Sequence, residues 1–439
     1  MAAAPMSANA DWLSRSHAAV WHPCTQMKLH ATLPLVPIAH AEGAWLTDFD
    51  GNRYLDGVSS WWVNLFGHAN PRIAAAIGAQ LRAVDHVMLA GFTHRPAVEL
   101  AERLAALAPR GLGHAFFASD GASAVEIALK MSVHCWRNRG HPQKCGILHL
   151  EGSYHGETAG ALAVTDIALF RDAYAPLLTA QTRIDSPVPR DGESREVASQ
   201  RAADALACHL AMHHASVAAL IVEPLVQGAS GMRMYDAGYL RRARELCSRY
   251  DVHLVADEIM TGFGRTGSMF ACGEAAIAPD LICLSKGITG GVLPLSVVLA
   301  SDAIYAAFYA DSVAQAFLHS HSYTGNALAC RAALTVLDLF EEGDVIVANR
   351  AKAGRWDTLA QALAAHPRVR GWRRCGMIVA FDVDAPRADF AQWFFGEALA
   401  RGILLRPIGN TVYFMPPYIV TDDEFAMLTQ GTAEILDRL

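Results

Sequence analysis

The sequence predicts an α/β protein: a large domain with a mostly parallel central sheet flanked by helices, plus a smaller α+β domain. Two observations predict this fold class. In the middle of the chain, short apolar runs alternate with helical patterns, which is typical of parallel strands linked by helices. The chain also has 439 residues, more than one ordinary domain holds.

The N-terminal section, residues 1–65, is expected to contribute to the smaller domain. It is expected to contain a strand pair, Ala44–Asp48 and Arg53–Asp56, because the intervening Phe49–Asn52 holds the turn-forming pair Asp50 and Gly51. Residues 66–325 are expected to form the large domain. Its strands are expected at His114–Ser119, Gly146–Leu150, Val217–Glu223, His253–Asp257, Leu281–Lys286 and Leu295–Ala300.

Two helical patterns lie between these strands, at Ser123–Arg137 and Tyr239–Tyr250. The polar stretch Arg183–Gln200 contains two prolines and a glycine and is expected to be a long surface connection. Residues 326–439 are expected to form the C-terminal small domain. It would begin with a helix at Ala327–Glu342 and contain strands near Met377–Phe381 and Val412–Met415.

Composition limits the classes of partner. The formal net charge is -7 and the Lys and Arg residues are scattered, so neither nucleic acid nor an acidic membrane surface is favoured, and a small molecule is the expected partner. The nine cysteines are dispersed, without metal-ligand spacing, and are expected to be reduced. The N-terminus lacks the pattern of a signal peptide, so we expect a cytoplasmic protein without a membrane span and without a metal site.

Two apolar runs each end in a charged residue, Lys286 in one run and Asp257 in the other, and the two residues have opposite charge. In parallel sheets, ligands bind beyond the carboxyl ends of the strands. Pyridoxal 5'-phosphate (PLP) needs both groups, because its aldehyde forms a Schiff base with a lysine and its protonated ring nitrogen needs an anion. The alternatives are a lysine that merely extends to the surface and an aspartate that caps the following turn.

Two turns are candidates for holding the rest of such a cofactor. The turn Ser119–Ser123 joins a strand to a helix, so the amides around Gly121 and Ala122 are placed to hold a phosphate, although ordinary N-caps look similar. Tyr154 follows another strand and is placed to stack on a flat ring, with a packed core aromatic as the alternative.

Substrate contacts are expected from outside these turns. Trp61 and Trp62 form an aromatic pair that is suited to line an apolar pocket, although adjacent tryptophans usually place at least one ring in a core. Arg406 precedes the C-terminal strand and is suited to clamp a carboxylate with two parallel hydrogen bonds, or else to form a surface ion pair.

Taken together, several segments resemble the class III (ω-amino) aminotransferases of PLP fold type I. The resemblance runs through nearly the whole large domain and is carried by Glu223-Pro224, Gln227-Gly228-Ala229, Asp257-Glu258-Ile259, Gly262 to Gly267, Pro279-Asp280 and Ser285-Lys286-Gly287.

The resemblance implies a role for each candidate residue. Lys286 would be the Schiff-base lysine and the acid/base, Asp257 would pair with the pyridine nitrogen, and Tyr154 would stack on the ring. Gly121 and Ala122 would hold the phosphate, with Ser322 of a neighbouring subunit, which implies a homodimer with shared active sites. Arg406 would hold the substrate carboxylate, and Trp61, Trp62 and Tyr154 would line the substrate.

Further segments resemble the branch of this family that acts in biotin synthesis: Trp21-His22-Pro23, Ser59 to Trp62, Gln227 to Tyr235 and Tyr413 to Tyr418. The resemblance implies conversion of 8-amino-7-oxononanoate to 7,8-diaminononanoate, with S-adenosyl-L-methionine as the expected amino donor and lysine as the other donor that relatives use. Three positions depart from the pattern, Cys24, Ala122 and Glu157, where a tyrosine, a hydroxyl residue and an aspartate are common. The alternatives are another class III transaminase, acting on an ω-amino acid, a diamine or pyruvate, and a non-catalytic PLP-binding module.

Overall fold

A computed structural model describes residues 7–33 and 35–439. The chain forms two compact units. The larger unit comprises Arg72–Ala351 and Arg373–Ile378, and the smaller comprises Met1–Pro71, Lys352–Trp372 and Val379–Leu439. The smaller unit is therefore built from both ends of the chain.

A seven-stranded sheet forms the centre of the larger unit. Among the described residues, one strand, β12, runs antiparallel to both of its neighbours. The strands on one side of it are parallel to one another: β11, β10, β7, β5 and β6. This confirms the expected mostly parallel sheet. The strands, in order across it, are β4 (His114–Ala118), β12 (Ser296–Ala300), β11 (Leu281–Leu284), β10 (His253–Asp257), β7 (Val217–Val222), β5 (Gly146–Leu150) and β6 (Thr182–Ile184).

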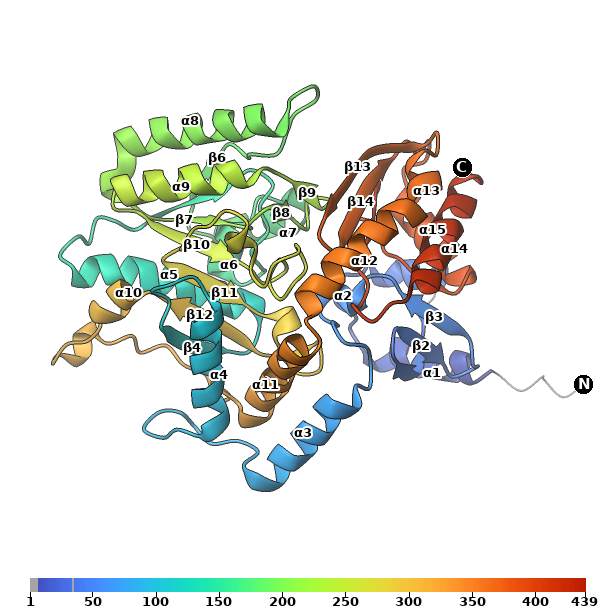
Figure 1. Cartoon of the computed structure of the whole chain (residues 1–439), viewed down its shortest axis with the longest axis horizontal. Helices are drawn as coiled ribbons and strands as arrows, with labels where there is room; N and C mark the ends of the chain where they lie inside the picture. Colours follow the sequence, from blue (N-terminus) through green and yellow to red (C-terminus); the bar gives the residue numbers. More distant parts are fainter. Residues whose placement is uncertain (1–6, 34) are drawn as a thin grey trace, which may run out of the picture. The chain divides into compact units, whose positions relative to one another are not determined.

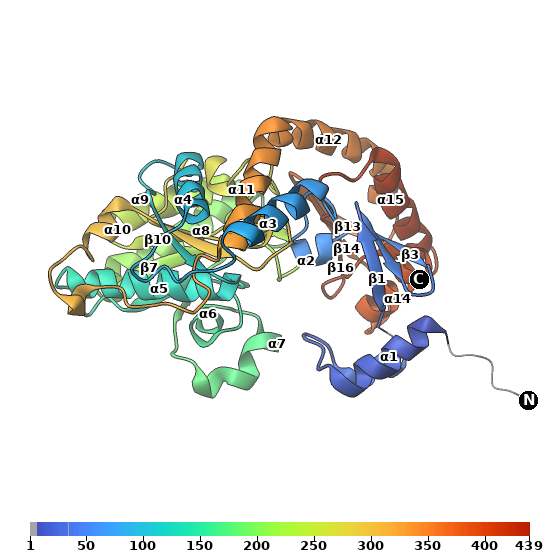
Figure 2. The same cartoon turned by 90° about the horizontal axis from the view of Figure 1, so that it is seen from below.

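Helices cover both faces of this sheet. Helix α5 (Gly121–Asn138) packs on β7, β11 and β12, while α9 (Ala237–Arg249) packs on β10 and is covered by α8 (Arg195–His213). Figures 1 and 2 show α5 and α9 on opposite sides of the sheet. The face of α5 that meets the sheet is apolar and fully buried, as Val125, Ile127 and Ala128 show.

The stretch Arg183–Gln200 differs from the expected surface connection. Its first residues belong to β6, and its last residues begin α8, so only the middle is a loop. The strand was missed because β6 has only three residues, two of them exposed, and therefore lacks an apolar run. The helix was missed because its buried residues are mostly Ala and Ser.

Helix α11 (Ala327–Glu342) has the bounds expected from the sequence. It packs against α4 (Arg95–Leu107) and against the 3-10 turn Lys286–Thr289, and so it belongs to the larger unit. The sequence-based boundary at residues 325 and 326 had placed it in the small domain. Shorter helices of this unit are α6 (Ala159–Ala163), α7 (Ala168–Arg171) and α10 (Asp302–Ala306), and α3 (Pro71–Ala83) begins at the unit boundary.

The smaller unit contains the expected hairpin, observed as β2 (Trp45–Asp48) and β3 (Arg53–Asp56). The Asp48 carboxylate holds its turn by accepting the amides of Asp50 (3.0 Å) and Asn52 (2.8 Å). The flanking strands are β1 (Ile38–Glu42) and β15 (Ile403–Leu404). A second sheet has the order β13 (Val369–Cys375), β14 (Ile378–Val383), β16 (Thr411–Phe414), and its residues Arg373–Ile378 belong to the larger unit. The helices include α1 (Ala8–Ala19), the part of α12 (Val345–Leu359) that begins at Lys352, α13 (Gln361–Ala364), α14 (Phe390–Ala400) and α15 (Asp422–Leu436).

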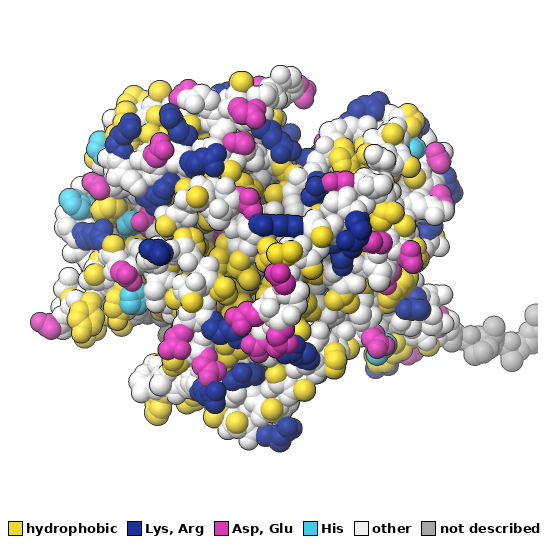
Figure 3. Space-filling model, viewed as in Figure 1, with side chains coloured by type: hydrophobic (Ala, Val, Ile, Leu, Met, Phe, Trp, Pro, Cys, Tyr) yellow, Lys and Arg dark blue, Asp and Glu magenta, His cyan; other side chains and the backbone are white. Residues whose placement is uncertain are grey.

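The surface carries mixed charge. On the face shown in Figure 3, basic and acidic side chains are interspersed. All nine cysteines are free, and five of them are buried. Within residues 7–33 and 35–439, every helix is either too short or too polar to cross a bilayer.

Candidate active site

Lys286 lies just beyond the end of β11, at the start of a 3-10 turn. Its φ of 49° is in the left-handed region, which is uncommon for a residue with a side chain and is typical of functional turns. Loss of hydration lowers the pKa of the Lys286 amine, and the negative charges of Asp257 and Glu223 partly oppose that shift. The site therefore favours the neutral amine more than water does.

Asp257 is the last residue of β10 and is buried, with 5% of its surface exposed. One carboxylate oxygen, Oδ2, lies 2.7 Å from Nδ1 of His155, and the other accepts the amide of Ile259 at 3.1 Å. An ionised carboxylate only accepts hydrogen bonds, so Nδ1 of His155 carries the hydrogen. The parallel register places Asp257 beside Cys283, three residues before Lys286, so both residues lie at the same edge of the sheet.

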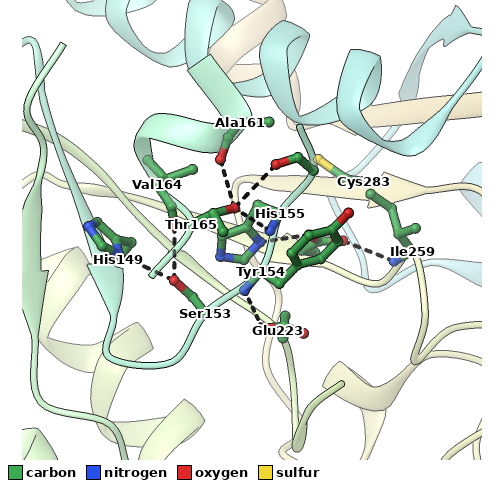
Figure 4. A network of polar contacts seen from close by, with 12 residues as sticks. His149, Ser153, Tyr154, His155, Ala161, Val164, Thr165, Glu223, Ile259 and Cys283 are labelled. Atoms are coloured by element: carbon green, nitrogen blue, oxygen red, sulfur yellow. Dashed lines mark hydrogen bonds and ion pairs between the residues drawn. The ribbon is translucent and has the colours of Figure 1, made fainter. Parts of the chain in front are cut away.

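His155 is held by a second set of contacts. Its backbone amide donates to Oγ1 of Thr165 (3.0 Å), and that hydroxyl donates to the carbonyl of Ala161 (3.0 Å). Figure 4 shows Thr165 between His155 and Ala161. The sequence alone indicates no role for His155. The only signal was its position beside Tyr154 after an apolar strand.

Tyr154 is tied to the sheet through Glu223, which follows β7. The Tyr154 amide donates to Oε2 of Glu223 (3.0 Å), and the amide of Gly228 donates to Oε1 (2.9 Å). Burial raises the pKa of Glu223 to about 7, and the nearby Asp257 charge adds to the shift. The Tyr154 hydroxyl donates to Glu157 (2.9 Å). The backbone of Tyr154 is therefore positioned by a buried carboxylate, and its ring by Glu157.

The turn at Gly121 and Ala122 forms the N-terminus of α5, an 18-residue helix. The Asp120 side chain caps it by accepting the amide of Ser123 at 2.9 Å. The first amides of a helix have no partner within the helix, and they attract anions. This turn touches the segment that carries Tyr154: a Cβ added at Gly156 would lie 2.6 Å from the Cβ of Ala122.

These contacts bring five of the predicted residues together within the larger unit: Lys286, Asp257, Tyr154, Gly121 and Ala122. Ser322 lies in the same unit, exposed on a turn; the neighbouring His321 places Nε2 3.3 Å from Oγ of Ser119, next to the α5 turn. The role expected for Ser322 requires a second subunit and stays a prediction.

Trp61, Trp62 and Arg406 belong to the smaller unit. The Arg406 guanidinium lies over the Trp61 ring, with Cζ 4.9 Å from its centroid, and Nη2 donates to the carbonyl of Cys24 (3.2 Å). Trp62 is buried, and its Nε1 donates to the hydroxyl of Tyr413 (3.0 Å). Both tryptophans have positive φ, a conformation that costs about 1–2 kcal/mol per residue in a left-handed helix.

Comparison with known proteins supplies the family. The sequence model described as Aminotransferase class-III matches residues 27–436. The chain belongs to the class-III aminotransferases. It is 45% identical over 428 residues to the adenosylmethionine-8-amino-7-oxononanoate aminotransferase of Helicobacter pylori, with 96% of each chain covered.

Solved structures agree with this assignment. The structure of adenosylmethionine-8-amino-7-oxononanoate aminotransferase from Methanocaldococcus jannaschii is similar with a TM-score of 0.91 and 33% identity, covering 97% of this chain and 98% of that chain. An omega transaminase from Pseudomonas jessenii, solved in complex with PMP, gives a TM-score of 0.92 and 28% identity, with 97% of each chain covered. The expected PLP fold type I is thus confirmed.

This class-III aminotransferase is a PLP-dependent enzyme. The residues of its larger unit fit the cofactor, because the α5 N-terminus suits a phosphate, Asp257 suits a protonated ring nitrogen, and Lys286 has the lowered pKa that an imine-forming amine needs. His155 is a further residue of this site, and the sequence does not predict it. It fixes the orientation of the Asp257 carboxylate from the side of the Tyr154 segment.

Proposed function

We propose that this aminotransferase converts 8-amino-7-oxononanoate to 7,8-diaminononanoate in biotin synthesis, with S-adenosyl-L-methionine as the amino donor. The observation that carries the proposal is the 45% identity, over 96% of both chains, to a Helicobacter pylori protein whose name states this donor and this acceptor. The Trp61, Trp62 and Arg406 constellation supports it, because the acceptor has an apolar chain that ends in a carboxylate.

In the larger unit, Lys286 moves the proton that the reaction requires. PLP, when bound, supplies an electron sink next to the substrate carbon. Lys286 accepts the proton from that carbon in its neutral form, which the lowered pKa favours. The protonated amine of Lys286 then delivers the proton to the cofactor carbon. Asp257, oriented by His155, would lie opposite the ring nitrogen as its anionic partner, and the α5 amides would hold the phosphate.

In the smaller unit, Arg406 binds the acceptor carboxylate. Its guanidinium is already oriented by the Trp61 ring and by the Cys24 carbonyl, so less side-chain entropy is lost when the acid binds. Trp61 and Trp62 provide apolar contacts for the chain of the acid. Cys24 contacts Arg406 through its carbonyl, and its side chain is an exposed free thiol.

The proposal is tested by mixing the purified, PLP-loaded protein with one amino donor at a time. S-adenosyl-L-methionine is expected to convert the visible cofactor absorbance to that of the pyridoxamine form, and 8-amino-7-oxononanoate is then expected to restore it. Lysine, ω-amino acids and diamines serve as the comparison donors, and pyruvate as the comparison acceptor. Conversion by a comparison donor but not by S-adenosyl-L-methionine would identify another class III transaminase, and no conversion by any donor would favour a non-catalytic PLP-binding module.

The proposal includes a cytoplasmic homodimer in which Ser322 of one subunit contacts the phosphate bound by the other. The exposed apolar side chains near Ser322 support it, since Leu318 is 77% exposed and Tyr323 is 64% exposed. Light scattering is expected to give twice the chain mass of 47.3 kDa. Ser322→Ala is expected to weaken PLP binding without changing that mass, and a monomer with full activity would rule the shared site out.

A further inference from the structure

Residues Ser59, Ser60, Trp61 and Trp62 form one turn of left-handed helix, α2 (Ser59–Trp62). Their φ values are 52°, 45°, 71° and 72°. Isolated positive φ values occur elsewhere in the chain, but a run of four residues with side chains is strained, because each Cβ crowds the following carbonyl. Such strain persists only where surrounding contacts enforce it, and it is concentrated at functional sites.

Asp56 supplies the contacts that enforce this turn. Its side chain is fully buried, and Oδ1 accepts the amides of Val58 (3.2 Å) and Ser60 (2.9 Å). Oδ2 accepts the Ser60 hydroxyl (2.7 Å) and lies 3.1 Å from Nε2 of His68. One carboxylate thus binds the start of the turn from two sides, and His68 holds that carboxylate in place.

The turn also has an anchor at each end. Oγ of Ser59 donates to the carbonyl of Met415 (2.8 Å), and Nε1 of Trp62 donates to the hydroxyl of Tyr413 (3.0 Å). Both partners belong to the segment that includes and follows β16. Between these anchors Trp61 is left 46% exposed, and its ring is the surface over which the Arg406 guanidinium lies.

The geometry points to a positioning role: we propose that Asp56 and His68 fix the left-handed turn so that Trp61 holds Arg406 ready for the carboxylate of the acceptor. This inference rests on the proposed function, in which Arg406 binds that carboxylate. Asp56 and His68 do not touch the substrate. They act through the turn and Trp61, and a relaxed turn would move the Trp61 ring from beneath the guanidinium.

A structural role alone predicts a different result. If Asp56 and His68 only stabilised the fold, their loss would lower the melting temperature and the amount of active enzyme, and the Michaelis constant of the acceptor would stay the same. If they position Arg406, the Michaelis constant for 8-amino-7-oxononanoate rises while kcat and the donor half-reaction change little.

The experiment compares His68→Leu, Ser60→Ala and His68→Gln in the full-length, PLP-loaded enzyme. His68→Leu and Ser60→Ala each remove one contact to Asp56, and each is expected to raise the Michaelis constant for the acceptor about tenfold, with kcat within about twofold. His68→Gln keeps a donor for Asp56 and is expected to restore most of the binding. His40→Leu is the matched control, because His40 lies exposed on β1 of the same unit and is expected to change nothing.

A double-mutant cycle with Arg406→Ala tests the route of the effect. If His68 acts through Arg406, then His68→Leu is expected to add less than about twofold to the Michaelis constant once Arg406 is absent. Near-ultraviolet circular dichroism of the cofactor-free protein gives a readout independent of activity. His68→Leu is expected to remove the same tryptophan signal that Trp61→Phe removes.

The outcomes separate the two proposals. If Arg406→Ala leaves the Michaelis constant for the acceptor unchanged, the proposed carboxylate contact is wrong and the positioning inference falls with it. If Arg406→Ala raises that constant but both His68→Leu and Ser60→Ala leave it unchanged, only the positioning inference is overturned. Should His68→Leu fail to fold, Ser60→Ala and its cycle with Arg406→Ala decide the question alone.

Discussion

Nδ1 of His155 and Oδ2 of Asp257 lie 2.7 Å apart, with both side chains buried. The histidine comes from the segment after β5 and the aspartate from the end of β10, so the contact joins two parts of the larger unit that lie 102 residues apart in sequence. Because the pair is shielded from water, the direction of the Asp257 carboxylate is determined by His155 and by the Ile259 amide.

Replacement of Asp257 by Asn tests the charge at this position. Asp257→Asn keeps the size of the side chain but removes the anion opposite the ring nitrogen, so kcat is expected to fall on the order of 100-fold. Steady-state kinetics measures the effect. Asp311→Asn, at an exposed position of the same unit, is the control and is expected to leave kcat unchanged. Equal kcat values for the two variants would remove Asp257 from the reaction.

Lys286→Ala removes the amine that forms the link to PLP and moves the proton. Turnover is expected to fall about 1,000-fold or more, together with the visible absorbance of the lysine-linked cofactor. Lys130→Ala, at an exposed position on α5, is the matched control. Turnover retained by Lys286→Ala would contradict the assignment.

Arg406→Ala removes the proposed partner of the acceptor carboxylate. The Michaelis constant for 8-amino-7-oxononanoate is expected to rise roughly 10-fold to 100-fold, and more than the constant for the donor, because a charge-assisted pair is lost. Arg406→Lys is expected to recover only part of the binding, since an ammonium lacks the planar fork. Arg401→Ala, which removes an arginine paired with Glu397 in the same unit, is the control.

Glu223 makes the stability of the cofactor-free protein depend on pH. Its pKa is raised from 4.5 to about 7 in the folded protein, so between these values the folded state binds a proton that the unfolded state does not. The free energy of unfolding is therefore expected to fall as pH rises through this window, by up to about 3 kcal/mol from this group. Urea unfolding at pH 5 and pH 7.5 measures the loss, and Glu223→Gln is expected to flatten it. An unchanged pH dependence in Glu223→Gln would assign the slope to other groups.

The sheet of the larger unit could be predicted because its strands are buried on both faces. All six residues of β7 and all five of β10 are buried, so each reads as an unbroken apolar run that ends in a polar residue. That same pattern located Lys286 and Asp257. The short, half-exposed β6 carried no such signal.

Contacts between distant segments could not be predicted. Nothing in the sequence around His155 indicates that it lies against Asp257, because that pairing depends on the order of β5, β7 and β10 in the sheet. The left-handed turn that includes Trp61 could not be predicted from the sequence either. Glycine and asparagine are the residues that usually indicate positive φ in a sequence, and Ser59 to Trp62 contains neither.

The conformation of Trp61 limits how this enzyme can be redesigned to accept other substrates. A smaller side chain at position 61 would be the obvious way to enlarge an acceptor pocket, yet the backbone there, with φ of 71°, tolerates few residues. Valine, isoleucine and threonine are smaller than tryptophan, but they are β-branched and therefore disfavoured at this positive φ. Libraries at this position should therefore be built around glycine, asparagine and aspartate.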